Sequence, residues 1–379
     1  AVVNFGPGEA KEEFAKLQKF RPGRPVMSGE YWDGWCDHWG EKHQVTDAKQ
    51  QAEELDWILG RGASINLYMF HGGTSFGFMN GANFDKAYQP DATSYDYDSP
   101  VSESGALPPK YFAFRDVIAK HRPGVTIPEP PAPIPVIEVP DFELSKSASL
   151  WSSLPQPVSV ERPRSMESFG QSYGYILYRT KIGNRAKGDL LIHELRGYAQ
   201  VFINGAQAGT LDRRKNQNHL QVDAKAGSTL DILVEGTGRI NFGLELLAER
   251  QGINGAVTLD GKELSGWQVF SLPMDDLTGI RFAKAKDDSP GPHFYRGHFD
   301  LQITGDTFLD TRGWGKGAVW INGHALGRFW NLGPQQTLYV PAPWLRKGTN
   351  EVVVFAQQSP RSRSLRGLRA PVLDELGSE

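Results

Sequence analysis

Residues 28–40 read SGEYWDGWCDHWG and come directly after a short apolar run. The pattern predicts a buried strand over residues 25–30 that ends on Glu30, and three tryptophans follow before residue 41. A carboxylate beside flat apolar rings is typical of sites that hold a sugar and cleave its glycosidic bond. Such hydrolysis normally needs two carboxylates, and Glu30 is the single convincing one in this sequence.

Strands and helices alternate along the first 120 residues. Helices are predicted at 9–20, 47–59 and 108–120, and a second buried strand, SINLYMF, at 64–70. Asp47, with Gln50 three residues later, indicates the N-terminal cap of the middle helix. Alternation of this kind predicts a parallel sheet whose functional side chains lie at the carboxyl ends of the strands.

A proline-rich segment, residues 122–140, marks a domain boundary, because it is stiff and extended. Short β-rich runs follow it and contain an internal repeat: VFING at 201–205 returns as VWING at 319–323. Each Asn-Gly pair suits a type I′ hairpin turn. We therefore predict two β-sandwich domains, 141–275 and 276–379, the second ending in a frayed, charged tail from about residue 360.

Composition narrows the class of protein. The 379 residues carry a net charge of −3, and no apolar run approaches the length of a membrane span, which argues against nucleic-acid and membrane partners. Cys36 is the single cysteine, and no Asn-x-Ser/Thr sequon occurs, which mildly favours a bacterial source. A periplasmic or extracellular location is slightly favoured over the cytoplasm. The first residues, AVVNFGPGEAKEEF, lack the pattern of a signal peptide and read like the middle of a folded domain.

Aromatic residues suited to a sugar site surround Glu30 in this pattern. Tyr68 lies near the end of the strand at 64–70, and the loop SYDYDSP brings Tyr95 and Tyr97 after it. A phenol can hydrogen-bond an ionised carboxylate, and Trp35 can stack on the apolar face of a sugar. We expect these side chains to line one cleft.

Structural explanations remain open for the same residues. Glu30 could form an ion pair with Arg24 or Lys42, and the tryptophans could be ordinary core residues. The spacing of Asp37, His38 and His43 fits no standard metal site, so neither a metal nor another cofactor is expected. The glycine-rich stretch HGGTSFG lacks the end of a phosphate-binding loop, and we expect a flexible rim loop there.

The stretches GEYWDGWCDHWG, GASINLYMFHGGTSFGFMNGAN and SYDYDSPVSESG resemble the end of the catalytic barrel of family 35 glycoside hydrolases, which are retaining β-galactosidases. KGAVWINGHALGRFW and GPQQTLYVP resemble parts of the two C-terminal β-domains of that family, which are jelly-roll or galactose-binding-like. The resemblance implies an eight-stranded (β/α) barrel, with strands 6–8 in residues 1–121 and an active site at the carboxyl ends of the strands.

The resemblance also implies roles for individual residues. Glu30 takes the position of the catalytic nucleophile and Tyr97 that of a tyrosine that hydrogen-bonds galactose. Trp35 and Tyr68 match aromatics of the sugar pocket, with Tyr31 at its edge, and Tyr95 is expected beside them. The implied reaction is the hydrolysis of terminal non-reducing β-D-galactosyl residues of oligosaccharides or glycoconjugates.

One departure from the family matters. The acid/base glutamate of the family lies in an Asn-Glu-Tyr-Gly motif, which this sequence lacks, and Glu103 is a poor substitute because it precedes the last helix. We therefore expect the acid/base on an N-terminal barrel fragment and no activity without it. Two alternatives remain: a non-catalytic carbohydrate-binding or scaffold protein built on the β-sandwiches, and a relative with changed specificity, such as an exo-β-glucosaminidase.

Overall fold

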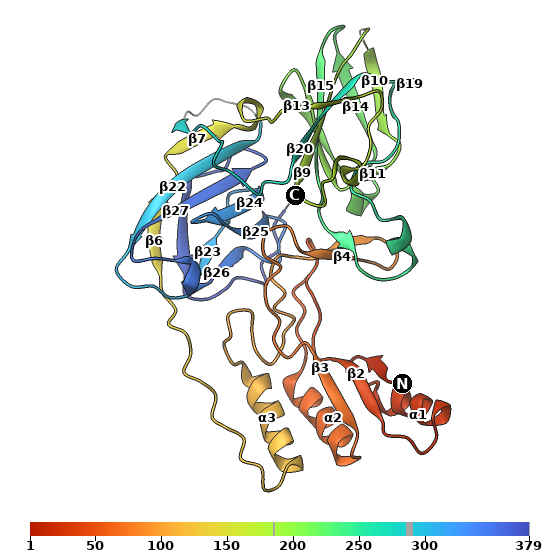
Figure 1. Ribbon diagram of the computed structural model, residues 1–379, viewed down its shortest axis with the longest axis vertical. Helices are drawn as coiled ribbons and strands as arrows, with labels where there is room; N and C mark the ends of the chain where they lie inside the picture. Colours follow the sequence, from red (N-terminus) through yellow and green to blue (C-terminus); the bar gives the residue numbers. More distant parts are fainter. Residues whose placement is uncertain (185, 286–290, 379) are drawn as a thin grey trace.

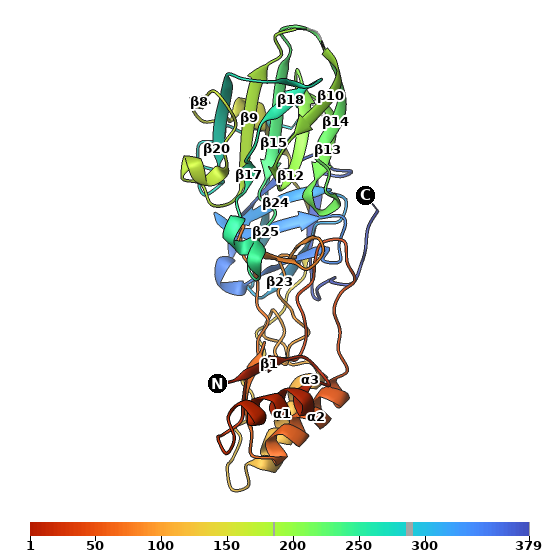
Figure 2. The ribbon, with the colours of Figure 1, turned by 90° about the vertical axis from the view of Figure 1, so that its right-hand side faces the viewer.

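The structure is a computed structural model that describes residues 1–184, 186–285 and 291–378. It is elongated, with an α/β part at one end, a β-sandwich at the other and a second β-sandwich between them (Figures 1 and 2). Long loops connect the α/β part to the two sandwiches. In the described ranges no helix has the length and apolar character needed to cross a membrane.

The α/β part holds three parallel strands in the order β1-β2-β3, as the sequence pattern predicts. The strands are β1 (Val3–Phe5), β2 (Met27–Trp32) and β3 (Ser64–Tyr68), and the helices are α1 (Ala10–Phe20), α2 (Ala48–Gly60) and α3 (Pro109–His121). All three helices agree with the sequence prediction to within one residue at each end.

Local sequence explains why these elements form. The Asp47 side chain accepts hydrogen bonds from the backbone N–H groups of Lys49 and Gln50, which satisfies two donors at the start of α2. The apolar stripes of the helices then bury against the sheet. Their core contains Phe5, Phe14, Leu55, Ile58 and Phe114. Burial of this kind contributes about 1.5–3 kcal/mol for each large side chain.

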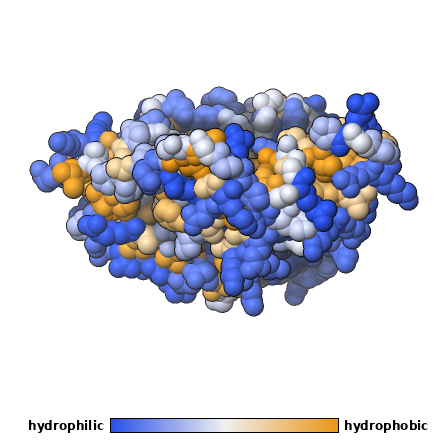
Figure 3. Space-filling view, turned by 90° about the horizontal axis from the view of Figure 1, so that it is seen from below, coloured by the Kyte–Doolittle hydropathy of each residue, from blue (hydrophilic) through white to orange (hydrophobic). Residues whose placement is uncertain are grey.

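Apolar side chains remain exposed in the α/β part. β1 pairs with β2 along one edge, and its other edge has no strand partner in the described part of the chain. A view from the helix side shows apolar patches among hydrophilic residues (Figure 3). In residues 1–121, the following large hydrophobic side chains are more than a third exposed: Val2, Phe20, Trp35, Val45, Phe70, Met79, Phe84, Phe112 and Ile118.

The first sandwich packs a six-stranded sheet on a four-stranded one around a shared apolar core. The larger sheet runs β13 (Ala206–Asp212), β12 (Tyr198–Ile203), β15 (Thr229–Glu235), β9 (Tyr175–Lys181), β20 (Trp267–Leu272), β8 (Val158–Val160). The smaller runs β14 (His219–Ala224), β10 (Ala186–Ile192), β18 (Val257–Leu259), β19 (Lys262–Glu263). β11 (Leu195–Arg196) pairs with β17 (Gly252–Ile253) beside them.

The second sandwich repeats this plan. Its larger sheet runs β21 (Ala283–Lys284), β7 (Lys146–Ser149), β22 (His293–Leu301), β27 (Gly348–Ala356), β24 (Lys316–Ile321), β25 (His324–Trp330). Its smaller sheet runs β26 (Thr337–Val340), β23 (Thr307–Asp310), β28 (Ser364–Leu368), β6 (Val139–Glu143). A small sheet of β16 (Arg239–Ile240), β4 (Gly81–Phe84) and β5 (Tyr88–Pro90) links the first sandwich to the α/β part.

Two sequence expectations about the sandwiches need correction. β6 and β7, which lie at or near the start of the expected first domain at 141–275, pair with β28 and β22 of the second sandwich. The supposed frayed tail contains β28, and Leu365 and Leu373 in it are buried. Pairing between strands this distant in sequence leaves no local signal, which is why the pattern missed it.

The internal repeat is confirmed as two matching hairpins. Asn204-Gly205 joins β12 to β13, and Asn322-Gly323 joins β24 to β25. All four residues have positive φ, between 47° and 84°, as a type I′ turn requires. Each hairpin also contains a register shift, at which the second strand has one extra residue: Ala208 in β13 and Leu326 in β25. The two sandwiches therefore share local as well as overall structure.

The two larger sheets pack against each other through aromatic side chains, including Tyr175, Phe202 and Phe355. Next to this apolar interface lies a buried ionic cluster. Glu235 of β15 contacts the Lys316 ammonium at 3.0 Å and the Arg328 guanidinium at 3.1 Å. One carboxylate from the first sandwich thus forms ion pairs with cations from two strands of the second.

Candidate active site

Glu30 lies near the carboxyl end of β2, the central strand of the parallel sheet. Its side chain is partly exposed, and its Oε2 accepts a hydrogen bond of 2.9 Å from Trp32 Nε1. Alternation along the strand puts these two side chains on the same face. No ion pair joins Glu30 to Arg24 or Lys42, all three of which are described. This carboxylate is therefore available to a ligand.

Aromatic rings extend from Trp32 as a connected cluster. Trp35 contacts Trp32 edge-to-face, with ring centroids 5.7 Å apart, and lies 6.2 Å from Tyr97. Tyr97 contacts Tyr68 at 5.7 Å and Tyr95 at 5.3 Å. The expected residues Trp35, Tyr68, Tyr95 and Tyr97 are thus brought together beside Glu30. Rings of this kind can bind the apolar face of a sugar.

Tyr97 is held in a constrained position. Its φ is +64°, a left-handed conformation that costs energy for a bulky residue. Its hydroxyl is buried, and no described residue forms a hydrogen bond with it. Burial raises the pKa of Tyr97, and electrostatic interactions with Cys36, Tyr68, Asp33 and Glu30 raise it further. The hydroxyl therefore stays protonated and can donate to a ligand.

Two glycines let the Tyr95–Tyr97 loop approach the strand ends. A Cβ at Gly34 would lie 1.5 Å from the Tyr97 carbonyl oxygen, and one at Gly72 would lie 2.2 Å from the carbonyl oxygens of Tyr95 and Asp96. No side chain fits at either position, so the close approach needs glycine there. These contacts fix the loop against both β2 and β3.

A buried lysine, Lys110, anchors the same loop through hydrogen bonds. The Lys110 ammonium, at the start of α3, donates to the Asp33 carbonyl oxygen at 2.7 Å, to Thr46 Oγ1 at 2.6 Å and to Asp98 Oδ2 at 2.7 Å. Asp98 follows Tyr97 directly, so the lysine restrains that tyrosine. Burial raises the pKa of the neighbouring Asp33 carboxyl to about 7, against the attraction of Lys110.

Glu103 holds the loop from the other side. It is fully buried, and its two carboxylate oxygens accept hydrogen bonds of 2.7 Å from Thr74 Oγ1 and Ser94 Oγ. These contacts make Glu103 a brace between the glycine-rich rim loop and the Tyr95–Tyr97 loop. The rim loop itself is fixed by backbone hydrogen bonds, from Ser75 N–H to the Thr93 oxygen and from Gly77 N–H to the Ala325 oxygen. The expected flexible loop is therefore well anchored.

Glu103 should make stability depend on pH. Burial raises its pKa from 4.5 to about 7, although the Thr74 and Ser94 hydrogen bonds oppose the shift. The native state therefore holds a proton that the unfolded chain releases, so this contribution to the free energy of unfolding falls between pH 4.5 and 7. In the wild type the free energy of unfolding should fall by an amount on the order of 3 kcal/mol, as measured by urea unfolding across that range. We expect Glu103→Gln to remove this fall. The exposed Glu245→Gln should keep the wild-type dependence of the free energy of unfolding on pH. An equal dependence on pH in Glu103→Gln and wild type would contradict the raised pKa of Glu103.

Tyr31 does not join the site, contrary to expectation. It is fully buried on the helix side of β2, packs edge-to-face on Phe5, and donates a hydrogen bond of 3.0 Å to Glu54 Oε2. The reason is strand alternation, because Glu30 and Tyr31 are neighbours and must face opposite sides of the sheet. The sequence prediction also missed Trp32, which the same alternation places beside Glu30.

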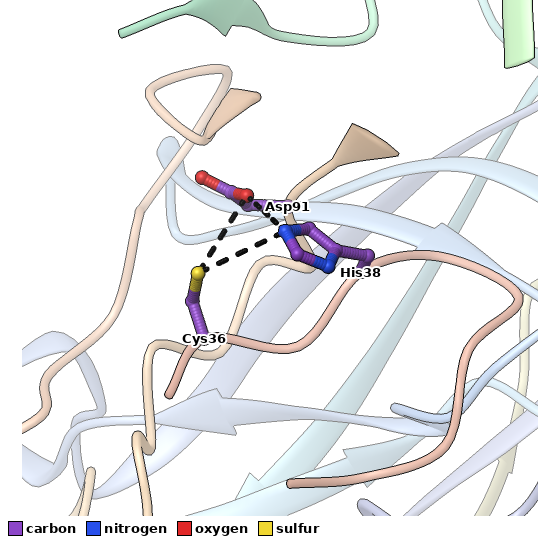
Figure 4. Close-up of side chains that lie close together, drawn as sticks. All are labelled: Cys36, His38 and Asp91. Atoms are coloured by element: carbon purple, nitrogen blue, oxygen red, sulfur yellow. Dashed lines mark hydrogen bonds and ion pairs between the residues drawn. The ribbon is translucent and has the colours of Figure 1, made fainter. Parts of the chain in front are cut away.

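A second polar cluster lies in the loop that follows β2. Cys36, His38 and Asp91 point toward one another (Figure 4). Cys36 Sγ lies 3.9 Å from both His38 Nε2 and Asp91 Oδ1, and His38 Nε2 lies 3.3 Å from Asp91 Oδ1. Asp37 is not part of this cluster, since it forms a separate pair of 2.7 Å with His43. No sequence pattern indicates this cluster, because Asp91 lies more than fifty residues beyond its partners.

An acid at the end of a parallel strand, beside a cluster of aromatic side chains, is the kind of arrangement that glycoside hydrolases use. Comparison with known families agrees. Residues 1–121 match the model of glycosyl hydrolases family 35, residues 163–273 the first all-beta domain of beta-galactosidase, and residues 292–350 its galactose-binding domain. Residues 1–121 of the chain therefore belong to glycosyl hydrolases family 35.

Curated relatives match most of this chain. A beta-galactosidase of Xanthomonas manihotis is 51% identical over 345 residues, which cover 90% of this chain and 57% of that protein. The human beta-galactosidase-1-like protein 2 is 39% identical over 350 residues, which cover 88% of this chain and 54% of the human protein. The chain thus spans rather more than half the length of these relatives.

Proposed function

We propose that the protein containing this chain hydrolyses terminal non-reducing β-D-galactosyl residues with retention of configuration, and that Glu30 is its nucleophile. The observation that carries the proposal is the position of Glu30 at a parallel strand end, beside the Trp35–Tyr97 aromatic cluster. The relatives named beta-galactosidase support the choice of galactoside as substrate.

The reaction proceeds in two displacements. A Glu30 oxygen attacks the anomeric carbon while the bond to the leaving oxygen breaks, and a second carboxyl group donates a proton to that oxygen. The carboxylate left behind takes a proton from water, which attacks the same carbon and releases Glu30 from the ester. The free Tyr97 hydroxyl is placed to bond the sugar or the carboxylate, and Trp35 to pack on the ring.

The acid/base belongs, in this proposal, to a barrel segment outside the 379 residues. A retaining site needs its two carboxyl groups about 5–5.5 Å apart. Glu103 cannot serve, because both of its oxygens are engaged in bracing the loop. The α/β part then contributes strands 6–8 of an eight-stranded barrel, and further strands cover the free edge of β1 and the exposed apolar residues around it.

Active-site labelling tests the proposal. The full-length gene product should be inactivated by a 2-deoxy-2-fluoro-galactosyl fluoride, because the fluorine slows hydrolysis of the glycosyl-enzyme and traps it. Peptide mass spectrometry should find the label on Glu30. A label on another carboxylate would refute Glu30 as nucleophile. Turnover of galactosides without labelling would refute the mechanism, and a glucosyl analogue that labels faster would refute the substrate class. Binding of galactosides without any turnover would favour the carbohydrate-binding alternative.

A further inference from the structure

The Cys36–His38–Asp91 cluster brings together three kinds of metal-ligating atom in one buried place. All three side chains are at least nine-tenths buried, and a sulfur, an imidazole nitrogen and a carboxylate oxygen lie within 4.8 Å of one another. Nothing in the proposed sugar chemistry uses them. His38 Nε2 already contacts Asp91 Oδ1 at 3.3 Å, and buried charged groups of this kind either pair with one another or coordinate a metal.

The separations fit a tetrahedral cation. With metal–sulfur bonds of about 2.3 Å and metal–nitrogen and metal–oxygen bonds of about 2.0–2.2 Å, ligand atoms stand roughly 3.4–3.6 Å apart. The observed separations of 3.9, 3.9 and 3.3 Å come within a few tenths of an ångström of that arrangement. The His43–Asp37 pair, at 2.7 Å, shows the shorter contact of a direct hydrogen bond.

The backbone holds the ligands in place. His38 and Asp91 face each other across an antiparallel bridge, and the neighbouring Trp39 N–H donates to the Pro90 oxygen at 3.0 Å. The Asp91 N–H donates to the Gly81 oxygen at 3.0 Å. A preformed arrangement of this kind lowers the cost of binding a ligand.

Glu41 supplies the support that metal-binding histidines usually have. Its Oε2 lies 3.3 Å from His38 Nδ1, which leaves Nε2 facing Cys36 and Asp91. Gln89 donates a hydrogen bond of 2.7 Å to the other oxygen of Glu41 and fixes its orientation. Glu41 also lines an open cavity of about 280 Å³, with Trp39, Tyr88 and Arg214 among its other walls.

We propose that Cys36 Sγ, His38 Nε2 and Asp91 Oδ1 bind a divalent cation of the zinc type, with a water molecule as fourth ligand. A thiolate and a carboxylate neutralise its charge, and the mixed sulfur, nitrogen and oxygen set favours zinc or cobalt over magnesium or calcium. Binding displaces the thiol proton of Cys36 and any proton on His38 Nε2 to the buffer. The bound cation links the loop that contains Trp35 to the segment that precedes Tyr95.

Metal titration of the full-length gene product tests this site without reference to activity. The protein is stripped with a chelator and titrated with cobalt chloride, then with zinc chloride. We expect one cobalt ion to bind per chain with a thiolate-to-cobalt absorption band, and zinc to displace it. Binding should also release protons, so that the heat of binding varies with the ionisation enthalpy of the buffer. Failure to bind either ion stoichiometrically, or cobalt binding without the thiolate band, would overturn the proposal.

Variants separate the ligands from their surroundings. Cys36→Ala should abolish the thiolate band, and Asp91→Asn should weaken zinc binding by at least about tenfold. His43→Gln is the matched control, because His43 lies in the same loop and contacts Asp37 instead, and it should bind both ions as the wild type does. If Cys36→Ala fails to fold, the wild-type protein can be used instead: added zinc should protect the Cys36 thiol from an alkylating reagent. Alkylation at an unchanged rate would refute the site.

Discussion

Replacement of Glu30 by glutamine should lower kcat of the full-length gene product on an aryl β-galactoside by about 10⁴-fold or more, the scale on which loss of a covalent nucleophile acts. An amide cannot form the glycosyl ester, whereas its size keeps the hydrogen bond with Trp32 and the strand packing. The substrate should carry a good leaving group, so that the measurement reports the attack on the anomeric carbon rather than the proton donation.

Rescue by an external nucleophile makes this prediction specific. In Glu30→Ala, azide can occupy the space of the carboxylate and should restore turnover to give a glycosyl azide of inverted configuration, detectable by NMR. The exposed Glu53→Gln should keep wild-type kcat and serves as the control. Activity of Glu30→Gln within tenfold of the wild type would remove this residue from the mechanism.

The second large effect concerns the buried Glu235. Replacement by alanine leaves the Lys316 and Arg328 cations buried without their carboxylate, and an uncompensated buried charge typically costs about 3–5 kcal/mol. Burial already lowers the pKa of both cations, with Glu235 opposing that effect. We expect a fall of this size in the free energy of unfolding of the sandwiches, as measured by guanidinium denaturation with tryptophan fluorescence.

A double variant tests whether charge is the cause. Glu235→Ala combined with Lys316→Met should recover part of the loss, because one unpaired cation is removed with it. The exposed Glu161→Ala should leave the unfolding midpoint unchanged. An effect of Glu235→Ala below 1 kcal/mol, or no recovery in the double variant, would show that water or neighbouring groups already satisfy the two cations.

Sequence reasoning succeeded where the physical cause is local. The cap of α2 depends on Asp47 and residues within one turn of it, and each Asn-Gly hairpin depends on two backbone angles. The grouping of Glu30 with Trp35 could be predicted because a strand end and its aromatic neighbours are contiguous in the sequence. Tyr31 was misplaced because the predicted strand ended on Glu30, whereas β2 continues to Trp32 and its alternation turns Tyr31 to the other face.

Other features could not be read from a single sequence. The Cys36–His38–Asp91 cluster exists because β5 returns beside the loop after β2, and no spacing rule encodes that return. The membership of β6 and β7 in the second sandwich depends on partners that follow them by well over a hundred residues. Glu235 reads as an ordinary charged residue at a strand end until the two larger sheets are packed together.

The placement of β6 and β7 has a consequence for the order of folding during translation. The ribosome delivers these strands before the whole first sandwich, yet β6 must wait for β28, at Ser364–Leu368. The first sandwich can close while the second is still incomplete, and the early strands meanwhile present unpaired edges to other nascent chains. A pause late in synthesis, or loss of the last twenty residues, would therefore damage the central sandwich and spare the one at the far end.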